Sequence, residues 1–225
     1  MEAEILDIKK KYGRKEVLRG TSFRIASGRC LGILGANGTG KSTLLKILAG
    51  VLRPDAGQFL WRGQDLLQNT KLRADSVAYV PQGTPLIEEL SARDNLRLWY
   101  EPEALARSLE EGVLRELGVD AFLNTAAARL SGGMRKRLSI GCALAKDPEI
   151  LLLDEPTAAL DLVGKERILR CFERFRDEGG ALVMVSHDPW ELAACGEWRL
   201  LRGGVLLPYA YTGERETLLR DLEQP

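Results

Sequence analysis

A glycine-rich segment between two apolar stretches constrains this chain more than any other feature. Residues 35–42 read Gly-Ala-Asn-Gly-Thr-Gly-Lys-Ser and fit the pattern G-x-x-x-x-G-K-S/T. The apolar run 30–34 precedes the segment, and helical spacing follows it at Leu44, Ile47, Leu48 and Val51. This order predicts a buried strand, a loop whose backbone N–H groups cradle phosphate oxygens, and a helix that begins at the loop. A glycine-rich turn without a ligand is the alternative, and the flanking elements disfavour it.

Apolar periodicity elsewhere predicts an α/β fold with a mainly parallel sheet. Residues 3–8 and 20–26 alternate between apolar and polar side chains, which is typical of antiparallel strands. Further short strands are expected near 59–61 and at 77–80, 150–153 and 181–185. An amphipathic helix between the last two carries Ile168, Leu169, Phe172 and Phe175. Strands that alternate with helices favour a parallel sheet covered on both faces, next to an N-terminal antiparallel β subdomain.

Residues 89–145 differ from the rest because helical spacing replaces short strand-like runs there. The spacing involves Leu105, Leu109, Val113, Leu114 and Leu117. With 225 residues the chain exceeds a typical domain of ~150 residues, which favours one domain with an insertion. We expect a single domain over 1–225, with a core of residues 1–82 and 146–225 and a helical subdomain of residues 83–145.

Composition and charge exclude several classes of protein. Apolar residues make up 45% and charged residues 28% of the chain, which excludes disordered, collagen-like and coiled-coil proteins. The 32 Lys and Arg balance the 32 Asp and Glu, so a nucleic-acid-binding surface is not expected. Uncharged stretches such as 138–145 are shorter than the ~18 apolar residues of a membrane helix. The acidic start Met-Glu-Ala-Glu is unlike a signal peptide, so a cytosolic protein is expected.

Few residues could ligate a soft metal. The four cysteines form no Cys-x-x-Cys pair and are expected to be free thiols: Cys30, Cys142, Cys171 and Cys195. The single histidine, His187, excludes a His-rich metal centre.

Two carboxylates follow an apolar strand at residues 150–156, which read Ile-Leu-Leu-Leu-Asp-Glu-Pro. Buried parallel strands deliver functional groups at their carboxyl ends. Asp154 could hold Mg²⁺ through water, and Glu155 could orient or deprotonate a water molecule that attacks a γ-phosphate. A solvated acidic turn is the alternative.

A second glycine-containing segment, residues 130–134, reads Leu-Ser-Gly-Gly-Met. Ser131 can cap the following helix, and Gly132 and Gly133 would expose backbone N–H groups at its start, as in a second anion site. One chain does not need two such sites, but a head-to-tail dimer does. The basic run 135–137 is expected to be a solvated first helical turn, with a nucleic-acid contact as the alternative.

These motifs, in this order, resemble those of the ATP-binding subunit of ABC transporters over residues ~3–205. The resemblance implies a RecA-like P-loop NTPase core with ATP and Mg²⁺ as cofactors. It places the nucleotide against Tyr12, Gly35, Asn37, Gly38, Gly40, Lys41, Ser42, Thr43, Gln82, Ser131, Gly132 and Gly133. The implied metal ligands are Ser42, Gln82 and Asp154, and the implied catalytic residues are Lys41, Glu155 and His187.

Several of these assignments have structural alternatives, and the sequence departs from the family pattern. Tyr12 could pack against a strand end, Gln82 could be a turn residue, and His187 could be purely structural. Residues 130–134 correspond to the signature motif of the family, in which Met134 replaces the usual glutamine. This replacement removes a polar side-chain contact to the nucleotide and is expected to affect the turnover rate. Leu162 stands where a proline often follows the D-loop aspartate Asp161, so communication between the two sites could differ.

The resemblance implies an ATPase on the cytoplasmic face of a membrane. Its partners would be an integral membrane permease and a second ATP-binding subunit, identical or different, with no nucleic acid. Met134 and the absence of a regulatory domain after Leu207 favour export over import. A surface for the permease is expected among Leu86, Ile87, Leu90, Leu96, Leu98 and Trp99, with core burial as the alternative. A soluble ABC-type ATPase acting on nucleic acid or ribosomes is the second interpretation, and a P-loop kinase or GTPase is the third.

Overall fold

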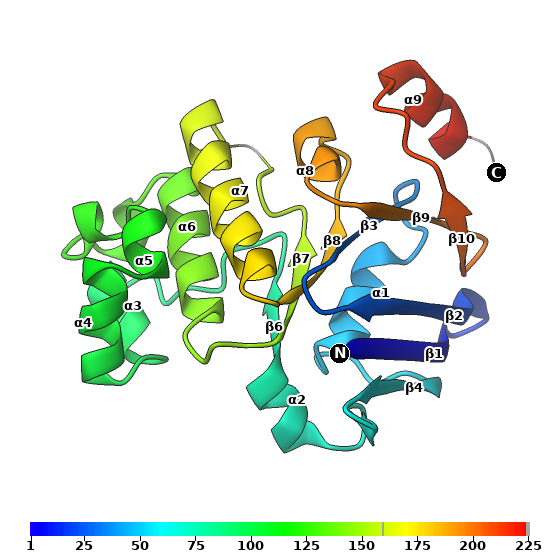
Figure 1. Ribbon diagram of the computed structural model, residues 1–225, viewed down its shortest axis with the longest axis horizontal. Helices are drawn as coiled ribbons and strands as arrows, with labels where there is room; N and C mark the ends of the chain where they lie inside the picture. The colour runs from blue at the N-terminus through cyan, green and yellow to red at the C-terminus, as the bar shows by residue number, and fades with distance from the viewer. Residues whose placement is uncertain (159, 224–225) are drawn as a thin grey trace.

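The protein is built on two β-sheets, one antiparallel and one mixed. The computed structural model describes residues 1–158 and 160–223 (Figure 1). The antiparallel sheet has the order β2-β1-β4-β5. Its strands are β1 (Glu2–Tyr12), β2 (Lys15–Ala26), β4 (Ala56–Trp61) and β5 (Gln64–Asp65).

The mixed sheet has the order β10-β9-β3-β8-β7-β6. Its strands are β3 (Cys30–Leu34), β6 (Val77–Val80), β7 (Ile150–Asp154), β8 (Ala181–Val185), β9 (Glu197–Arg202) and β10 (Val205–Tyr209). Neighbouring strands are parallel except β10, which pairs with β9 in the antiparallel direction. The expected α/β class, with a mainly parallel sheet and an N-terminal antiparallel sheet, is therefore confirmed.

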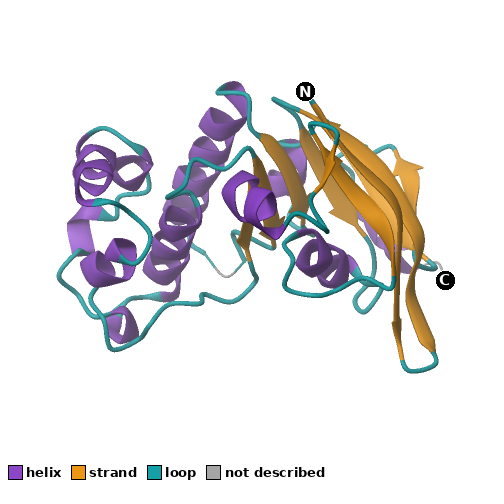
Figure 2. Cartoon of the chain, turned by 90° about the horizontal axis from the view of Figure 1, so that it is seen from below, coloured by secondary structure: helices purple, strands orange, loops and turns teal. Residues whose placement is uncertain are grey.

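The helices are unevenly distributed about these sheets. They are α1 (Lys41–Leu48), α2 (Thr70–Ser76), α3 (Ala92–Arg97), α4 (Pro102–Glu110), α5 (Val113–Glu116), α6 (Gly132–Ala143), α7 (Leu162–Asp177), α8 (Pro189–Ala193) and α9 (Arg215–Glu223), with 3₁₀ turns η1 (Asp120–Phe122) and η2 (Ala127–Arg129). Helices α3–α6 gather at one end of the molecule and the antiparallel sheet lies at the other, with the mixed sheet between them (Figures 1 and 2). The division into a core and a subdomain of residues 83–145 stays a prediction.

Both faces of the mixed sheet are buried, which explains its continuous apolar strands. Successive side chains of a strand point to opposite faces. Ile150 and Leu152 of β7 accordingly belong to the core shared with α1 and the antiparallel sheet, whereas Leu151 and Leu153 belong to the core shared with α6 and α7. The side chains of β8 alternate between the same two cores.

The structure corrects the expected helix after the glycine-rich loop. Helix α1 ends at Leu48, and Val51 lies beyond it as an exposed side chain rather than on the buried stripe. The chain leaves the helix at Gly50, whose φ of 76° is in the left-handed region. None of the described helices combines the length and apolar character needed to cross a bilayer.

Candidate functional site

The glycine-rich loop connects β3 to α1 at the carboxyl edge of the mixed sheet, and its tight path requires glycine. Gly35 has a φ of 152° and Gly40 a φ of 109°, which L side chains rarely adopt. A Cβ atom on Gly35 would lie 2.7 Å from the Leu201 carbonyl oxygen, and one on Gly40 would lie 2.7 Å from Val17 Cγ1. The loop can therefore hold its backbone N–H groups at the start of α1 only with glycine at these positions.

Lys41, the first residue of α1, folds back over this loop. Its Nζ donates hydrogen bonds to the carbonyl oxygens of Gly35 at 2.6 Å and Ala36 at 3.0 Å. Burial lowers the pKa of the Lys41 ammonium, and the carboxylates of Glu155 and Asp154 oppose that shift. The positive charge is thus held at the loop, where phosphate oxygens would bind.

Asp154, at the end of β7, is buried beside the start of α1. Its carboxylate accepts hydrogen bonds from Ser42 Oγ at 3.2 Å and from the Tyr79 hydroxyl at 3.3 Å. Burial, and then the Asp154 charge, raises the pKa of Tyr79, which therefore stays a donor. Hydroxyl and carboxylate oxygens in direct contact suit Mg²⁺, which binds through one or two protein carboxylates and substrate phosphates.

Glu155 occupies a strained turn immediately after β7. Its φ of 48° is unusual for a residue other than glycine, and its N–H donates to the Val185 carbonyl oxygen at 2.9 Å. Its carboxylate accepts a 2.8 Å hydrogen bond from Gln82 Nε2. The Nε2 atom of His187 lies 3.9 Å from the other carboxylate oxygen.

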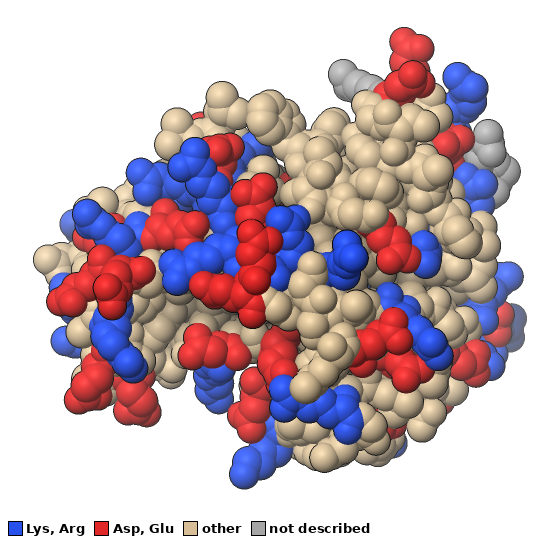
Figure 3. Space-filling view, in the orientation of Figure 1, with Lys and Arg blue, Asp and Glu red and all other residues tan. Residues whose placement is uncertain are grey.

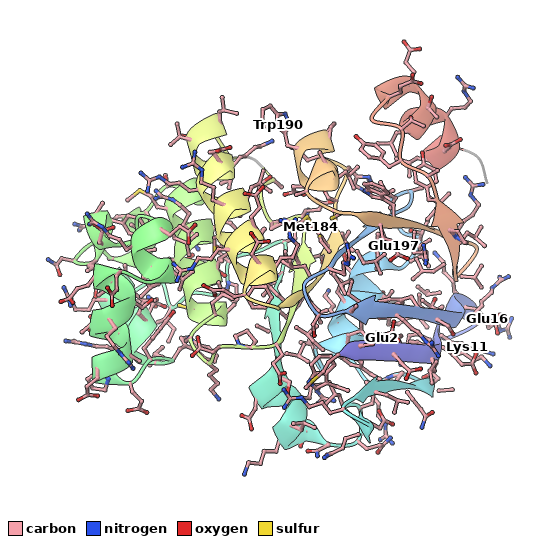
Figure 4. The ribbon with its side chains drawn as sticks, in the orientation of Figure 1. Glu2, Lys11, Glu16, Met184, Trp190 and Glu197 are labelled. Atoms are coloured by element: carbon pink, nitrogen blue, oxygen red, sulfur yellow. The ribbon has the colours of Figure 1, made fainter. Side chains whose placement is uncertain are left out.

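His187 belongs to the segment that connects β8 to α8. Figure 4 labels Met184 of β8 and Trp190 of α8, which precede and follow this segment in the chain. Its buried Nε2 has no hydrogen-bond partner among the described residues. Burial, followed by the charge of Lys41, lowers the pKa of the imidazole, and Glu155 opposes the shift. A neutral imidazole therefore places a buried nitrogen, unpaired among the described residues, 3.9 Å from the Glu155 carboxylate.

A pocket of about 420 Å³ joins most of the predicted residues. It is lined by Val17, Asn37, Gly38, Gly40, Lys41, Ser42, Thr43, Gln82 and Glu155. Val17, from β2, has no motif to mark it and was not predicted. Tyr12 does not line the pocket, because it lies half exposed at the end of β1. Its neighbour Lys11 forms an ion pair with Glu16, with 2.6 Å between Nζ and Oε1 (Figure 4). A stacking role for Tyr12 stays a prediction.

The second glycine segment lies apart from this pocket. Ser131 caps α6, because its hydroxyl accepts a 3.3 Å hydrogen bond from the Met134 N–H. Ser131 and Gly133 line a different pocket, of about 580 Å³, together with Asp161 and Gly164. One chain therefore does not bring Ser131, Gly132 and Gly133 to its own glycine-rich loop.

Two buried charges near the site were not predicted. Glu191 of α8 is 1% exposed, and its carboxylate accepts the Thr157 N–H at 2.6 Å, which ties the segment after His187 to the segment after Glu155. Lys136 is only 4% exposed. The expectation that the basic run 135–137 is a solvated turn is therefore wrong for its middle residue. Sequence patterns assign charged residues to the surface, and neither position carries a signal to the contrary.

The sequence around this site matches a known family. The model of the ABC transporter family matches residues 18–158, which is more than half of the chain. The chain belongs to the ABC transporter family. It is 35% identical over 188 residues to a Nod factor export ATP-binding protein I of Sinorhizobium fredii, a match that spans 82% of this chain and 55% of that protein. It is 32% identical to the linearmycin resistance ATP-binding protein LnrL of Bacillus subtilis, over 80% of this chain and 60% of that protein.

A solved structure supports the same assignment. The cassette superposes with a TM-score of 0.81 and 28% identity on a dimeric ATP-binding cassette in a post-hydrolysis state with ADP and phosphate. That match covers 91% of this chain and 96% of the other. The chain spans less than two thirds of the length of its two curated relatives above. The ABC cassette fold, with its P-loop, is thus confirmed.

Proposed function

We propose that this cassette binds ATP with Mg²⁺ in the pocket at the glycine-rich loop and hydrolyses its γ-phosphate. The observation that carries the proposal is the convergence of Lys41, Gln82 and Glu155 on one pocket, with Asp154 and Ser42 in contact beside it. The ADP and phosphate of the similar dimeric cassette support the same chemistry. Its reaction class is phosphoryl transfer to water.

Each residue of the site would have a distinct role in ATP binding or hydrolysis. Lys41 and the loop N–H groups would bind the terminal phosphates. Ser42, Gln82 and, through water, Asp154 would hold Mg²⁺, whose charge would offset that of the phosphates. Glu155 orients the attacking water and accepts its proton. The Nε2 atom of His187, which is buried and has no hydrogen-bond partner among the described residues, would turn to the γ-phosphate when ATP binds.

The second glycine segment supports a head-to-tail dimer. Because Ser131 and Gly133 lie outside the pocket of their own chain, they would close over the nucleotide of a partner cassette. The dimeric form of the similar solved cassette supports this arrangement. Two ATP molecules would then lie between two cassettes, either identical or different.

We further propose that the dimer drives transport through a separate membrane permease and works at the cytoplasmic face of the membrane. The named relatives are export and resistance proteins, which favours export. On the face shown in Figure 3, basic and acidic side chains are interspersed, which disfavours action on nucleic acid.

Phosphate release from ATP by the purified chain with Mg²⁺ tests the enzymatic part. Lys41→Met should lower turnover by about 100-fold or more, because it removes a positive charge at the phosphates. Lys46→Met is the matched control, since Lys46 is an exposed lysine of the same helix, and it should keep turnover. Equal activity in the two variants would contradict the assignment of this pocket.

A further inference from the structure

Lys136 is a buried cation that the proposed hydrolysis does not use. It lies in the second turn of α6, five residues after Ser131. Its Nζ donates hydrogen bonds to the carbonyl oxygens of Pro81 at 2.8 Å and Gln82 at 2.9 Å. Removing an ammonium from water is costly unless hydrogen bonds replace the lost solvation, and these two carbonyls supply them.

The neighbouring arginine makes a second connection to the same segment. Arg135 donates from Nε to Thr84 Oγ1 at 3.3 Å and forms an ion pair of 2.6 Å with Glu88. Glu88 is largely exposed, so this ion pair contributes little on its own. The buried Lys136 contacts are therefore the stronger part of the link between α6 and the segment that follows β6.

Gln82 takes part in this link with its backbone and in the site with its side chain. Its carbonyl oxygen accepts from Lys136, while its Nε2 donates to Glu155 at 2.8 Å. A displacement of α6 that moves this carbonyl would therefore shift the backbone that carries the amide at Glu155. The N-cap of α6 is Ser131, the residue that would face the nucleotide of a partner cassette.

We infer that Lys136 is a positioning residue that couples the start of α6 to Gln82, and thereby couples the two nucleotide sites of the dimer. This inference rests on the proposed function, because only a head-to-tail dimer places one nucleotide at Ser131 and the other at Gln82. Closure of α6 on the partner's nucleotide would set Gln82 against Glu155 in its own site. Occupation of one site is then communicated to the other through one side chain.

The test compares Lys136→Met, which keeps an unbranched buried chain without donors, with Lys136→Arg, which keeps the donors. In Lys136→Met the turnover should fall roughly tenfold, the loss expected for hydrogen bonds to a charged group, and the Hill coefficient for ATP should fall toward 1. ATP affinity should stay within about twofold, because the loop and Lys41 are intact. Thermal stability should fall modestly in Lys136→Met, because the carbonyl oxygens of Pro81 and Gln82 lose their donor. Lys136→Arg should recover much of the turnover.

The matched control is Lys146→Met, an exposed lysine just beyond the same helix. Wild-type turnover and cooperativity in Lys136→Met would overturn the inference. A second result would also overturn it: turnover that falls together with the melting temperature and that Lys136→Arg does not recover. That pattern would indicate a purely structural residue.

Hydrogen exchange gives a readout that needs no hydrolysis. Peptides covering residues 82–88 should exchange faster in Lys136→Met than in the wild-type chain, and at the wild-type rate in Lys136→Arg and Lys146→Met. Unchanged exchange in Lys136→Met would overturn the link. If the wild-type chain hydrolyses no ATP, the proposed function fails. The hydrogen-exchange result would then still show whether Lys136 holds the segment 82–88.

Discussion

Gln82 donates a 2.8 Å hydrogen bond from its amide to the carboxylate of Glu155. The two residues follow β6 and β7, which pair in parallel, so their carboxyl ends meet at one edge of the sheet. Glu155 is held on its other side by the backbone contact to Val185. The carboxylate is therefore oriented before any substrate binds, as a group that must act on one water molecule requires.

Replacing Glu155 by Gln should keep ATP binding and lower turnover by about 100-fold or more, because the amide cannot accept a proton from water. With ATP and Mg²⁺ the variant should accumulate as a nucleotide-bound dimer. Size-exclusion chromatography measures the dimer, and phosphate release measures turnover. Near-normal turnover would show that the Glu155 carboxylate is not needed for hydrolysis. A missing dimer is the weaker criterion, because the membrane partner could be needed for it.

His187 should respond to the γ-phosphate. Because the chain has a single histidine, its imidazole NMR signals need no assignment. In the Glu155→Gln variant these signals should shift more with ATP and Mg²⁺ than with ADP, since Nε2 has no partner among the described residues and lies 3.9 Å from the Glu155 carboxylate. His187→Ala should lower turnover and largely spare nucleotide affinity. Unchanged signals together with full activity in His187→Ala would leave the histidine a structural role only.

The pH dependence of stability should reveal the buried carboxyl of Glu191. Burial raises the pKa of Glu191 above its usual 4.5, and hydrogen bonds from Ser186 and Thr157 oppose the shift. The folded chain therefore binds this proton more tightly than the unfolded chain, so this group adds stability as pH falls and costs stability above its folded-state pKa. Glu191→Gln does not titrate. Its free energy of unfolding relative to wild type should be highest near neutral pH and should decline as pH falls toward 4.5.

Urea unfolding of both proteins between about pH 5 and 8 measures this difference. The exposed Glu103→Gln on α4 is the control and should show a smaller pH-dependent difference from wild type. A difference for Glu191→Gln that is constant with pH would contradict the raised pKa. Glu191→Ala, by contrast, should lose about 1–3 kcal/mol of stability, because it leaves the buried Thr157 N–H without an acceptor.

The cysteines should resist thiol reagents in the folded chain. All four are free and buried, as expected from their spacing, and Cys30 Sγ lies 2.7 Å from Cys195 Sγ. Burial raises the pKa of Cys142 and of Cys171 to about 12, so hardly any reactive thiolate forms at neutral pH. Labelling by a thiol reagent should be more than about 1000-fold slower than for a peptide thiol, and complete after unfolding. Rapid labelling of the folded chain would contradict the buried positions.

The proposed permease contact can be tested on three exposed apolar side chains. Ile87, Leu98 and Trp99 are 47%, 56% and 54% exposed, whereas Leu96 of the same stretch is fully buried in the core. Replacing each exposed residue by Glu should abolish copurification with a membrane protein from native membranes and keep ATPase activity of the isolated chain. Leu207→Glu, an exposed leucine of β10, is the control. Retained copurification in all three variants would contradict this contact surface.

Local patterns in the sequence are sufficient to predict much of the fold and to identify the candidate site residues. The loop at 35–42 was predicted because its glycines and its flanking periodicities are encoded within a few residues. The same holds for β7 with Asp154 and Glu155 at its end. Helix α1 was predicted one turn too long, because Val51 fits the apolar spacing and only Gly50 ends the helix. The sequence patterns do not predict β5, which has only two residues, β9, which charges interrupt, or β10, which a proline interrupts.

Only the tertiary structure decided which of these residues meet and which charges are buried. The contact between Gln82 and Glu155 depends on the parallel pairing of β6 with β7, whose residues lie some seventy positions apart in the sequence. Lys136 and Glu191 carry charges that a sequence pattern assigns to solvent. Their burial is tolerated because the fold brings distant backbone carbonyl and N–H groups within hydrogen-bond distance of them, and no local pattern specifies such partners.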